Sequence, residues 1–419
     1  MKRIMRAGAW LMVIAMMAFA PFFAASLSAE KENPVRKSRT TWTGVLRLWK
    51  CEGWQSGNGS LTAWLNACIE RFEKRNPGVY IQVKEVAAEA MRSFMNSANP
   101  PDMILYAPGM LEAPYSLAVM EEEIPVQQTL QGMGIWQEER YAAPVAMGGY
   151  ALAVNTKLLP QIPDHWGEME LSQAKGSKQI GVLLNMPADG DYRSWAAAVM
   201  AMFAGNYKKG TAAEPVPVGE GVDLGLPAGE PEKMEQSEAE TGEVLPNALP
   251  AVLPEDFRKQ ESVYTQFTSG KIAVMPVTQR ELRRLQLLSE TGKAPDWRVE
   301  TIGAAFTDQT AMFSVVAWER EDIEARQGLC LEFMRLMLSE EMQKKLTVSR
   351  AFSVRGMAAL YAGNQGMSAM EAALKSESLL VPPVFGNEWR VYAGDLMDGI
   401  GAGEATQEKY GLLEMMLKK

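Results

Sequence analysis

Residues 44–109 constrain the fold most, because short apolar strands and a helix follow one another there with clear stops between them. The run GVLRLWK is typical of a strand. After a Gly- and Ser-rich loop, the run LTAWLNACIERFEK repeats apolar residues at the spacing of one helix face. Asn76-Pro77-Gly78 ends this helix, and the strand-like run VYIQVKEV follows. The order predicts a parallel α/β layer, with the loop at residues 52–60 at the carboxyl end of the first strand, where ligands bind in such sheets.

Strands and helices continue to alternate through most of the chain. Further strands are expected at residues 103–106, 142–144 leading into 150–155, 180–184, 271–275, 297–302 and 311–318. Helices are expected at residues 87–98, 111–120, 192–204, 257–268, 279–291, 323–338, 339–346 and 357–375, and from 392 to the end. Ser339 is expected to cap the helix that it begins. Because 419 residues exceed what one core usually covers, we expect two domains.

Residues 211–254 interrupt this alternation. The segment holds nine acidic residues, one basic residue, seven prolines and five glycines, and it carries most of the formal net charge of −9. Its charge and its lack of apolar periodicity predict a disordered acidic insertion. A docking segment for a basic partner is the alternative.

The first 29 residues have the pattern of an export signal. Lys2, Arg3 and Arg6 precede an uncharged run at residues 7–25 and a group of small residues. The pattern predicts cleavage after Ser26 or Ser28, while an uncleaved membrane anchor stays open because the run is nearly long enough to span a bilayer. No cysteine follows the apolar run, so a lipoprotein is not expected. We expect an exported protein, at the extracellular face of the membrane or in the periplasm, with a linker at residues 30–43.

Composition argues against several classes of function. A net charge of −9 disfavours a nucleic-acid partner, which would need concentrated Lys and Arg. The single histidine, His165, gives little support to a metal site rich in histidine or to a Ser-His-Asp triad, and it is expected in a loop. No metal and no cofactor are expected.

The three cysteines, Cys51, Cys68 and Cys330, leave at least one thiol unpaired in a monomer. Cys51 ends the first strand and Cys68 lies about 12 Å along the following helix, which runs in the opposite direction. A disulfide requires Cα atoms within about 7 Å. Buried free thiols are therefore favoured, and a bond between Cys51 and Cys68 stays open.

Several segments, taken in order, resemble the extracellular solute-binding proteins of ABC importers, in the carbohydrate-binding group that includes maltose-binding protein. These segments are ACIERFEKRNPGVYIQV, PDMILYAPG, YAAPVAMGGYALAVNTKLL, FTSGKIAVMP and FMRLMLSEEMQKKL. The resemblance implies an α/β, two-lobed periplasmic-binding-protein-like fold with an interlobe hinge and a ligand cleft. It places lobe 1 at residues 44–147 plus about 303–350, and lobe 2 at residues 148–302 plus about 351–419. It also implies a monomer that binds a small molecule, a carbohydrate above all, and has ABC permease subunits as partners.

Aromatic and planar polar side chains near predicted strand ends are the candidate ligand contacts, because sugars present flat apolar faces and rims of hydroxyl groups. The candidates are Glu52 and Trp54 in the first loop, Tyr106 after the third strand, Gly148, Gly149 and Tyr150 at the lobe crossing, Gln279 and Arg280 after VMPVT, and Trp389 near the end. The two glycines permit close backbone approach or hinge dihedrals. For Arg280 a solvated position in the first helical turn is the alternative. Trp64 and Trp318 are expected in the core.

These residues favour one function and leave one alternative open. The favoured one is capture of a sugar or similar polar solute and its delivery to a membrane permease. A non-transport role as an anchored sensor or cell-envelope protein is the alternative, to which the acidic insertion and the missing lipid anchor point. A glycosidase would need two carboxylates at the cleft. Glu52 and Asp102 are the only acidic residues expected near the cleft. Asp102 precedes its strand and so lies at the wrong end of it, and an enzyme is therefore not expected.

Overall fold

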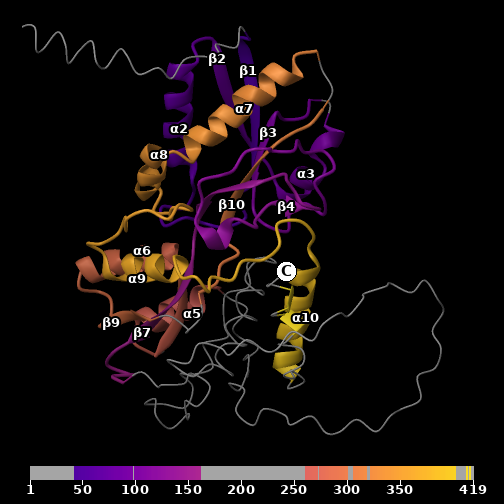
Figure 1. Ribbon diagram of the computed structural model, residues 1–419. Helices are drawn as coiled ribbons and strands as arrows, with labels where there is room; N and C mark the ends of the chain where they lie inside the picture. Colours follow the sequence, from indigo (N-terminus) through magenta and orange to yellow (C-terminus); the bar gives the residue numbers. More distant parts are fainter. Residues whose placement is uncertain are drawn as a thin grey trace, which may run out of the picture. The chain divides into compact units, whose positions relative to one another are not determined.

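The computed structural model describes residues 42–161 except 98, residues 260–402 except 272, 301–304 and 319–320, and residues 412, 413, 415 and 416 (Figure 1). The expected export signal, His165, the strand at 180–184, the helix at 192–204 and the acidic segment at 211–254 lie outside the described residues. Among the described residues, no helix combines the length and the apolar character that crossing a membrane requires.

A five-stranded mixed sheet contains the strands of the N-terminal stretch. Its order is β2 (Val79–Glu85), β1 (Gly44–Lys50), β3 (Met103–Tyr106), β10 (Thr310–Val315) and β6 (Ala143–Met147). β1 pairs in parallel with both β2 and β3, whereas β10 is antiparallel to β3 and β6. The carboxyl ends of β1, β2 and β3 therefore share one edge of the sheet, as the sequence predicts.

Two long helices pack against this sheet (Figure 1). They are α2 (Thr62–Arg75) and α7 (Ile323–Met337). The ring of Phe333 contacts Phe72 at 5.3 Å and Phe313 at 6.2 Å, both edge to face, so one aromatic cluster joins α7 to α2 and to β10. Trp64 is fully buried and its Nε1 donates to the carbonyl of Met342 at 2.8 Å, which confirms its place in the core.

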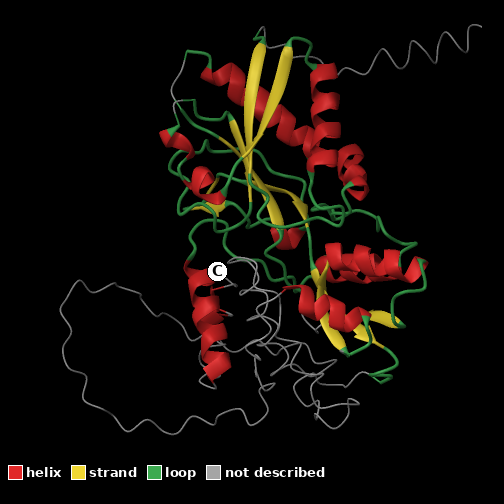
Figure 2. Ribbon diagram, turned by 180° about the vertical axis from the view of Figure 1, so that it is seen from behind, coloured by secondary structure: helices red, strands yellow, loops and turns green. Residues whose placement is uncertain are grey.

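A three-stranded antiparallel sheet has the order β8 (Val274–Thr278), β7 (Tyr150–Asn155) and β9 (Trp297–Glu300). The helices α5 (Gln260–Thr268), α6 (Gln279–Glu290) and α9 (Gln365–Leu374) belong to the same region. Figure 2 shows its strands in yellow and its helices in red. β8 begins three residues later than predicted, because Gly270 and Lys271 still hydrogen-bond back to α5.

The helix α10 (Glu388–Ala402) and several short elements complete the described chain. The short elements are α3 (Ala88–Arg92), η1 (Phe94–Asn96), η2 (Gln128–Leu130), β4 (Ile135–Trp136), β5 (Glu139–Arg140), α8 (Glu340–Lys344) and η5 (Lys345–Val348). The Ser339 side chain accepts from the backbone N–H of Met342, so the predicted cap is confirmed. The segment before α9 is not helical, because the Glu371 carboxylate binds the backbone N–H groups of Leu360 and Tyr361.

The predicted helix at residues 111–120 is wrong. Leu111 instead forms a parallel bridge with Phe385, and Leu117 forms an antiparallel bridge with Val316. Pro114 lies between them and lacks the N–H that a helix interior needs. Pairing with residues more than 190 positions away thus overrides the local apolar spacing.

All three cysteines are free. Cys68 and Cys330 are buried and Cys51 is half-buried, so the favoured prediction of free thiols is confirmed and no bond joins Cys51 to Cys68. Burial raises the pKa of the Cys68 thiol well above its ordinary value, which keeps it protonated and unreactive.

Candidate functional site

The chain passes between the two sheets at Gly148 and Gly149, which separate β6 from β7. It passes back between β9 and β10 through Thr307 and Gln309. The Gly148 N–H donates to the carbonyl of Gln309 at 2.6 Å, and Thr307 Oγ1 donates to the carbonyl of Gly148 at 2.7 Å. These bonds tie the two connecting segments directly together.

Gln279 joins this crossing to the loop after β1. The residue begins α6, where Thr278 and Glu281 form a capping box, and its side chain is fully buried. Its Nε2 donates to the carbonyl of Gln55 at 2.6 Å and to Gln309 Oε1 at 2.8 Å, while its Oε1 accepts from the Gly149 N–H at 3.0 Å. One amide group therefore binds three segments that lie far apart in the sequence.

Tyr150 links the crossing to a buried carboxyl group. Its hydroxyl donates to Asp308 Oδ1 at 2.7 Å, and its ring stacks on Phe306 at 5.4 Å. Burial raises the pKa of Asp308 to about 6, and the Tyr150 hydrogen bond and the charge of Arg390 only partly oppose this shift. Asp308 is 1% exposed, so this carboxyl group is shielded from water.

The segment before α10 lies against the loop that follows β3. The Gly109 N–H donates to the carbonyl of Val384 at 2.8 Å, and the Gly386 N–H donates to the carbonyl of Leu111 at 3.0 Å. Trp389 is buried here beside Gly109, and Arg390 donates to the carbonyl of Pro108. Trp389 therefore packs beside the loop that follows β3.

The structure brings Gly148, Gly149, Tyr150 and Gln279 into one hydrogen-bonded cluster, and it places the other candidates elsewhere. Glu52 Oε1 accepts from Lys50 Nζ and from the Leu61 N–H, both at 2.9 Å, so this carboxylate supports the start of α2. Arg280 is half-buried in the first turn of α6. Trp54 is 8% exposed, and its indole Nε1 has no hydrogen-bond partner within the described part of the chain.

Tyr106 is fully buried inside the five-stranded sheet and shares a hydrogen bond of 3.0 Å with Ser314 Oγ on β10. We expect Tyr106→Phe to lower the free energy of unfolding by about 1 kcal/mol, because one buried hydrogen bond is lost. Ligand affinity should not change. Urea denaturation and ligand titration check the two effects, and a fall in affinity with unchanged stability would contradict the packing role.

A pocket is lined by residues 92–96, between β2 and β3, and by the segment at residues 110–117, which follows β3 and reaches back to Val316 near the amino end of that strand. Its volume is about 340 Å³, within the range of about 300–1,000 Å³ that small-molecule sites occupy. Arg92, Asn96 and Glu112 are exposed polar side chains in its lining, and Tyr115 is 89% exposed beside them. The sequence pattern predicts helices at residues 87–98 and 111–120, so none of these side chains was expected at a site. The turn residue Pro114 next to this tyrosine is the signal that could have found them.

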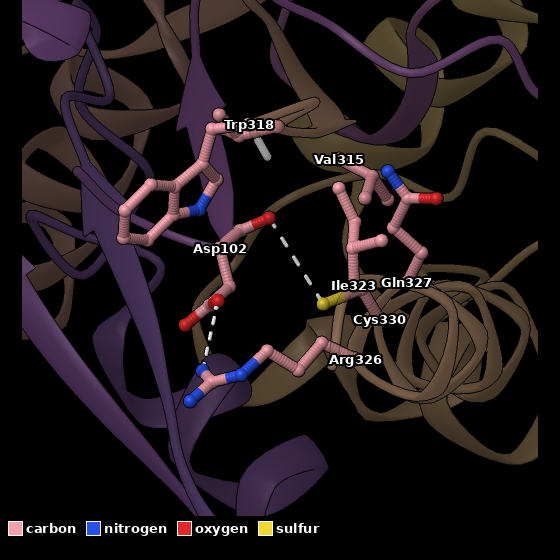
Figure 3. Close-up of a pocket in the computed structure, with 8 residues that line it drawn as sticks. Asp102, Val315, Trp318, Ile323, Arg326, Gln327 and Cys330 are labelled. Atoms are coloured by element: carbon pink, nitrogen blue, oxygen red, sulfur yellow. Dashed lines mark hydrogen bonds and ion pairs between the residues drawn. The ribbon is translucent and has the colours of Figure 1, made fainter. Parts of the chain in front are cut away.

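A second, much smaller cavity lies at the amino end of β3 (Figure 3). Arg326 binds Asp102 Oδ1 at 3.0 Å there, the Arg47 N–H binds Oδ2 at 2.7 Å, and half-buried Trp318 lies in the lining rather than in the core. Its volume of about 10 Å³ holds at most one water molecule. Asp102 thus lies far along the strand from Glu52 and does not form a carboxylate pair with it. Among the described residues, no group of His, Cys, Asp and Glu could hold a metal.

Comparisons with solved structures identify the fold. The cyclic alpha-maltosyl-1,6-maltose binding protein of Arthrobacter globiformis matches with a TM-score of 0.57 and 12% identity, over 90% of this chain and 98% of that chain. The sugar-binding protein MalE of Xanthomonas citri matches with a TM-score of 0.55 and 14% identity, over 90% and 98%. The GacH receptor of Streptomyces glaucescens matches with a TM-score of 0.53 and 14% identity, over 90% and 99%. The predicted α/β, two-lobed periplasmic-binding-protein-like fold is therefore confirmed.

The sequence matches none of the curated proteins with which it was compared. Residues 67–353, however, match the family described as bacterial extracellular solute-binding protein. This range covers most of the chain, from α2 to the segment that pairs with β6, and it confirms the resemblance seen in the sequence. The chain belongs to the family of bacterial extracellular solute-binding proteins.

Proposed function

We propose that this protein captures a sugar or oligosaccharide outside the cytoplasm and delivers it to the permease of an ABC transporter. The pocket lined by the segments that follow β2 and β3 is the observation that carries the proposal. It offers an exposed aromatic ring, Tyr115, next to the planar polar groups of Arg92, Asn96 and Glu112. A ring that covers a sugar face and polar groups that bind its hydroxyls are the elements such a ligand needs.

Two further features support a carbohydrate. The structural neighbours include proteins whose descriptions name cyclic alpha-maltosyl-1,6-maltose and acarbose as ligands. Trp54, in the loop after β1, keeps an indole N–H without a hydrogen-bond partner in the described residues. We assign it the role of a donor to a ligand hydroxyl. Gly148, Gly149 and Gln279 then act at the hinge, where they tie the two sheets, and not on the ligand.

A thermal-shift screen with maltose, maltodextrins and other oligosaccharides tests the proposal. At a ligand concentration of about 100 times Kd, binding stabilises the native state by about 2.7 kcal/mol, so at least one oligosaccharide should raise Tm by several degrees. Tyr115→Ala should remove most of that shift without lowering the Tm of the free protein, because the side chain is 89% exposed.

Tyr80→Ala is the matched control, since this tyrosine on β2 is 57% exposed and does not line the pocket. It should keep the full shift. A screen in which no sugar raises Tm would overturn the carbohydrate ligand. Delivery is tested separately: uptake of the identified sugar should depend on both this protein and its permease, whereas a sensor would leave uptake intact.

A further inference from the structure

A third cavity lies beside the three-stranded sheet, between α6, β9 and α9. Its volume is about 430 Å³, and it shares no lining residue with the pocket that Tyr115 lines. Figure 1 shows α6 and α9 side by side with β9 next to them, and the two helices contact each other. The proposed sugar site therefore leaves this cavity unexplained.

Three guanidinium groups line the cavity, from three different segments: Arg283 on α6, Arg298 on β9 and Arg350 after η5. Glu290 is the acidic residue in the same lining. Arginine offers up to five N–H donors in a planar fork that matches the oxygens of a carboxylate or phosphate group. The lining thus carries more positive charge than its own acid neutralises.

The ion pairs around these arginines are weak. Arg283 Nη1 lies 3.9 Å from Glu290 Oε1, and the glutamate side chain is 65% exposed. Arg298 Nε lies 3.2 Å from Glu300 Oε1, yet this buried N–H makes no hydrogen bond within the described residues. The Arg283–Glu290 pair, which is largely exposed on its glutamate side, contributes only about 0–1 kcal/mol. Much of the donor capacity of the cavity is therefore left for a ligand.

Arg350 is placed in the cavity by an unusual backbone conformation. Its φ of 52° lies in the left-handed region, which a residue other than glycine adopts at a cost of about 1–3 kcal/mol. The Gly57 N–H donates to its carbonyl at 3.1 Å, and its Nη1 donates to Gln286 Oε1 at 3.1 Å. Burial and the nearby charge of Arg283 lower the pKa of Arg350, as expected where like charges are held together.

The N-terminus of α9 also faces this cavity, because Asn364, Gln365 and Gly366 belong to the lining. The Asn364 side chain accepts from the Met367 N–H, and the first turn carries no acidic residue. The remaining first-turn N–H groups and the helix dipole favour a negative charge there. The helix N-terminus carries a partial positive charge, so it adds to the positive potential that the three arginines create in the cavity.

We propose that this cavity binds a small anionic molecule through a phosphate or carboxylate group, with Arg283, Arg298 and Arg350 as its ligands. The volume exceeds what a bare oxyanion needs, so a larger body is accommodated beside the charged group. Because Arg350 also holds Gly57 in the loop after β1, binding here is expected to order that loop.

The test titrates the protein with inorganic phosphate and with citrate, against sodium chloride at matched ionic strength, by calorimetry and thermal shift. At least one of the two anions should bind and raise Tm, and its affinity should fall as salt is added. Arg283→Gln and Arg298→Gln should each weaken binding at least tenfold. The preferred anion identifies the phosphate or the carboxylate class.

Arg284→Gln is the matched control. It removes the same charge from the same helix, but its guanidinium lies over Tyr264 at 4.0 Å and does not line the cavity. This variant should bind the anion like the parent protein. The proposal is overturned if neither anion binds beyond the chloride control, or if all three variants weaken binding equally. Both results are independent of the sugar screen.

Discussion

Gln279→Ala is expected to lower the free energy of unfolding by about 3 kcal/mol or more. The substitution leaves three groups without their partner: the carbonyl of Gln55, the Gln309 amide oxygen and the Gly149 N–H. The Gln309 oxygen and the Gly149 N–H are the buried groups among the three, and each buried polar group that loses its hydrogen bond costs about 1–3 kcal/mol. Urea denaturation followed by tryptophan fluorescence measures the loss.

Gln365→Ala provides the control, because Gln365 begins α9 as Gln279 begins α6, but its side chain is exposed. Gln365→Ala should change the free energy of unfolding by at most about 0.5 kcal/mol. Gln279→Glu adds a second comparison. An ionised carboxylate accepts from the Gly149 N–H but cannot donate to two oxygens, so this variant should be less stable at pH 7 than at pH 4. A Gln279→Ala protein as stable as the control would show that the cluster does not tie the sheets.

The elements with strong local signals could be predicted from the sequence. β1, α2 and β2 agree with the prediction because periodicity, the Gly- and Ser-rich loop and Asn76-Pro77-Gly78 act over a few neighbouring residues. α6 agrees because Thr278 and Glu281 cap it locally. Residues 111–120 could not be predicted, since their conformation depends on strand-like pairing with distant segments.

The candidate site was predicted less well, because residue type does not say which way a side chain points. Tyr106 is an aromatic residue at a strand end, as expected of a ligand contact. Its side chain is fully buried, however, and its hydroxyl group shares a hydrogen bond with Ser314. Asp308 could not be found from the sequence, because the residues that act on it, Tyr150 through a hydrogen bond and Arg390 through its charge, lie far away in the sequence. For Tyr106 and for Asp308, contacts with residues far away in the sequence decide where the side chain lies.

Asp308→Asn is expected to gain stability relative to the parent protein as pH rises from 4 to 7. The folded-state pKa of Asp308 is about 6, above its ordinary value of 3.8, so the native state favours the neutral carboxyl. That stabilisation is complete below the unfolded pKa and is lost as pH rises through the folded pKa. Asparagine stays neutral and can still accept from Tyr150. The difference in unfolding free energy should grow by up to about 3 kcal/mol, at about 1.4 kcal/mol per pKa unit.

Asp322→Asn should show the opposite trend, which makes it a control for pH effects elsewhere in the protein. Hydrogen bonds from Arg326 and Trp42 lower the pKa of Asp322, so its contribution is present above the unfolded pKa and is lost on acidification. This variant should therefore fall further behind the parent protein as pH rises from 3 to 5. Urea denaturation across the pH range measures both differences. If Asp308→Asn runs parallel to the parent protein from pH 4 to 7, Asp308 titrates as an ordinary carboxylate, and burial does not hold it neutral beside Tyr150.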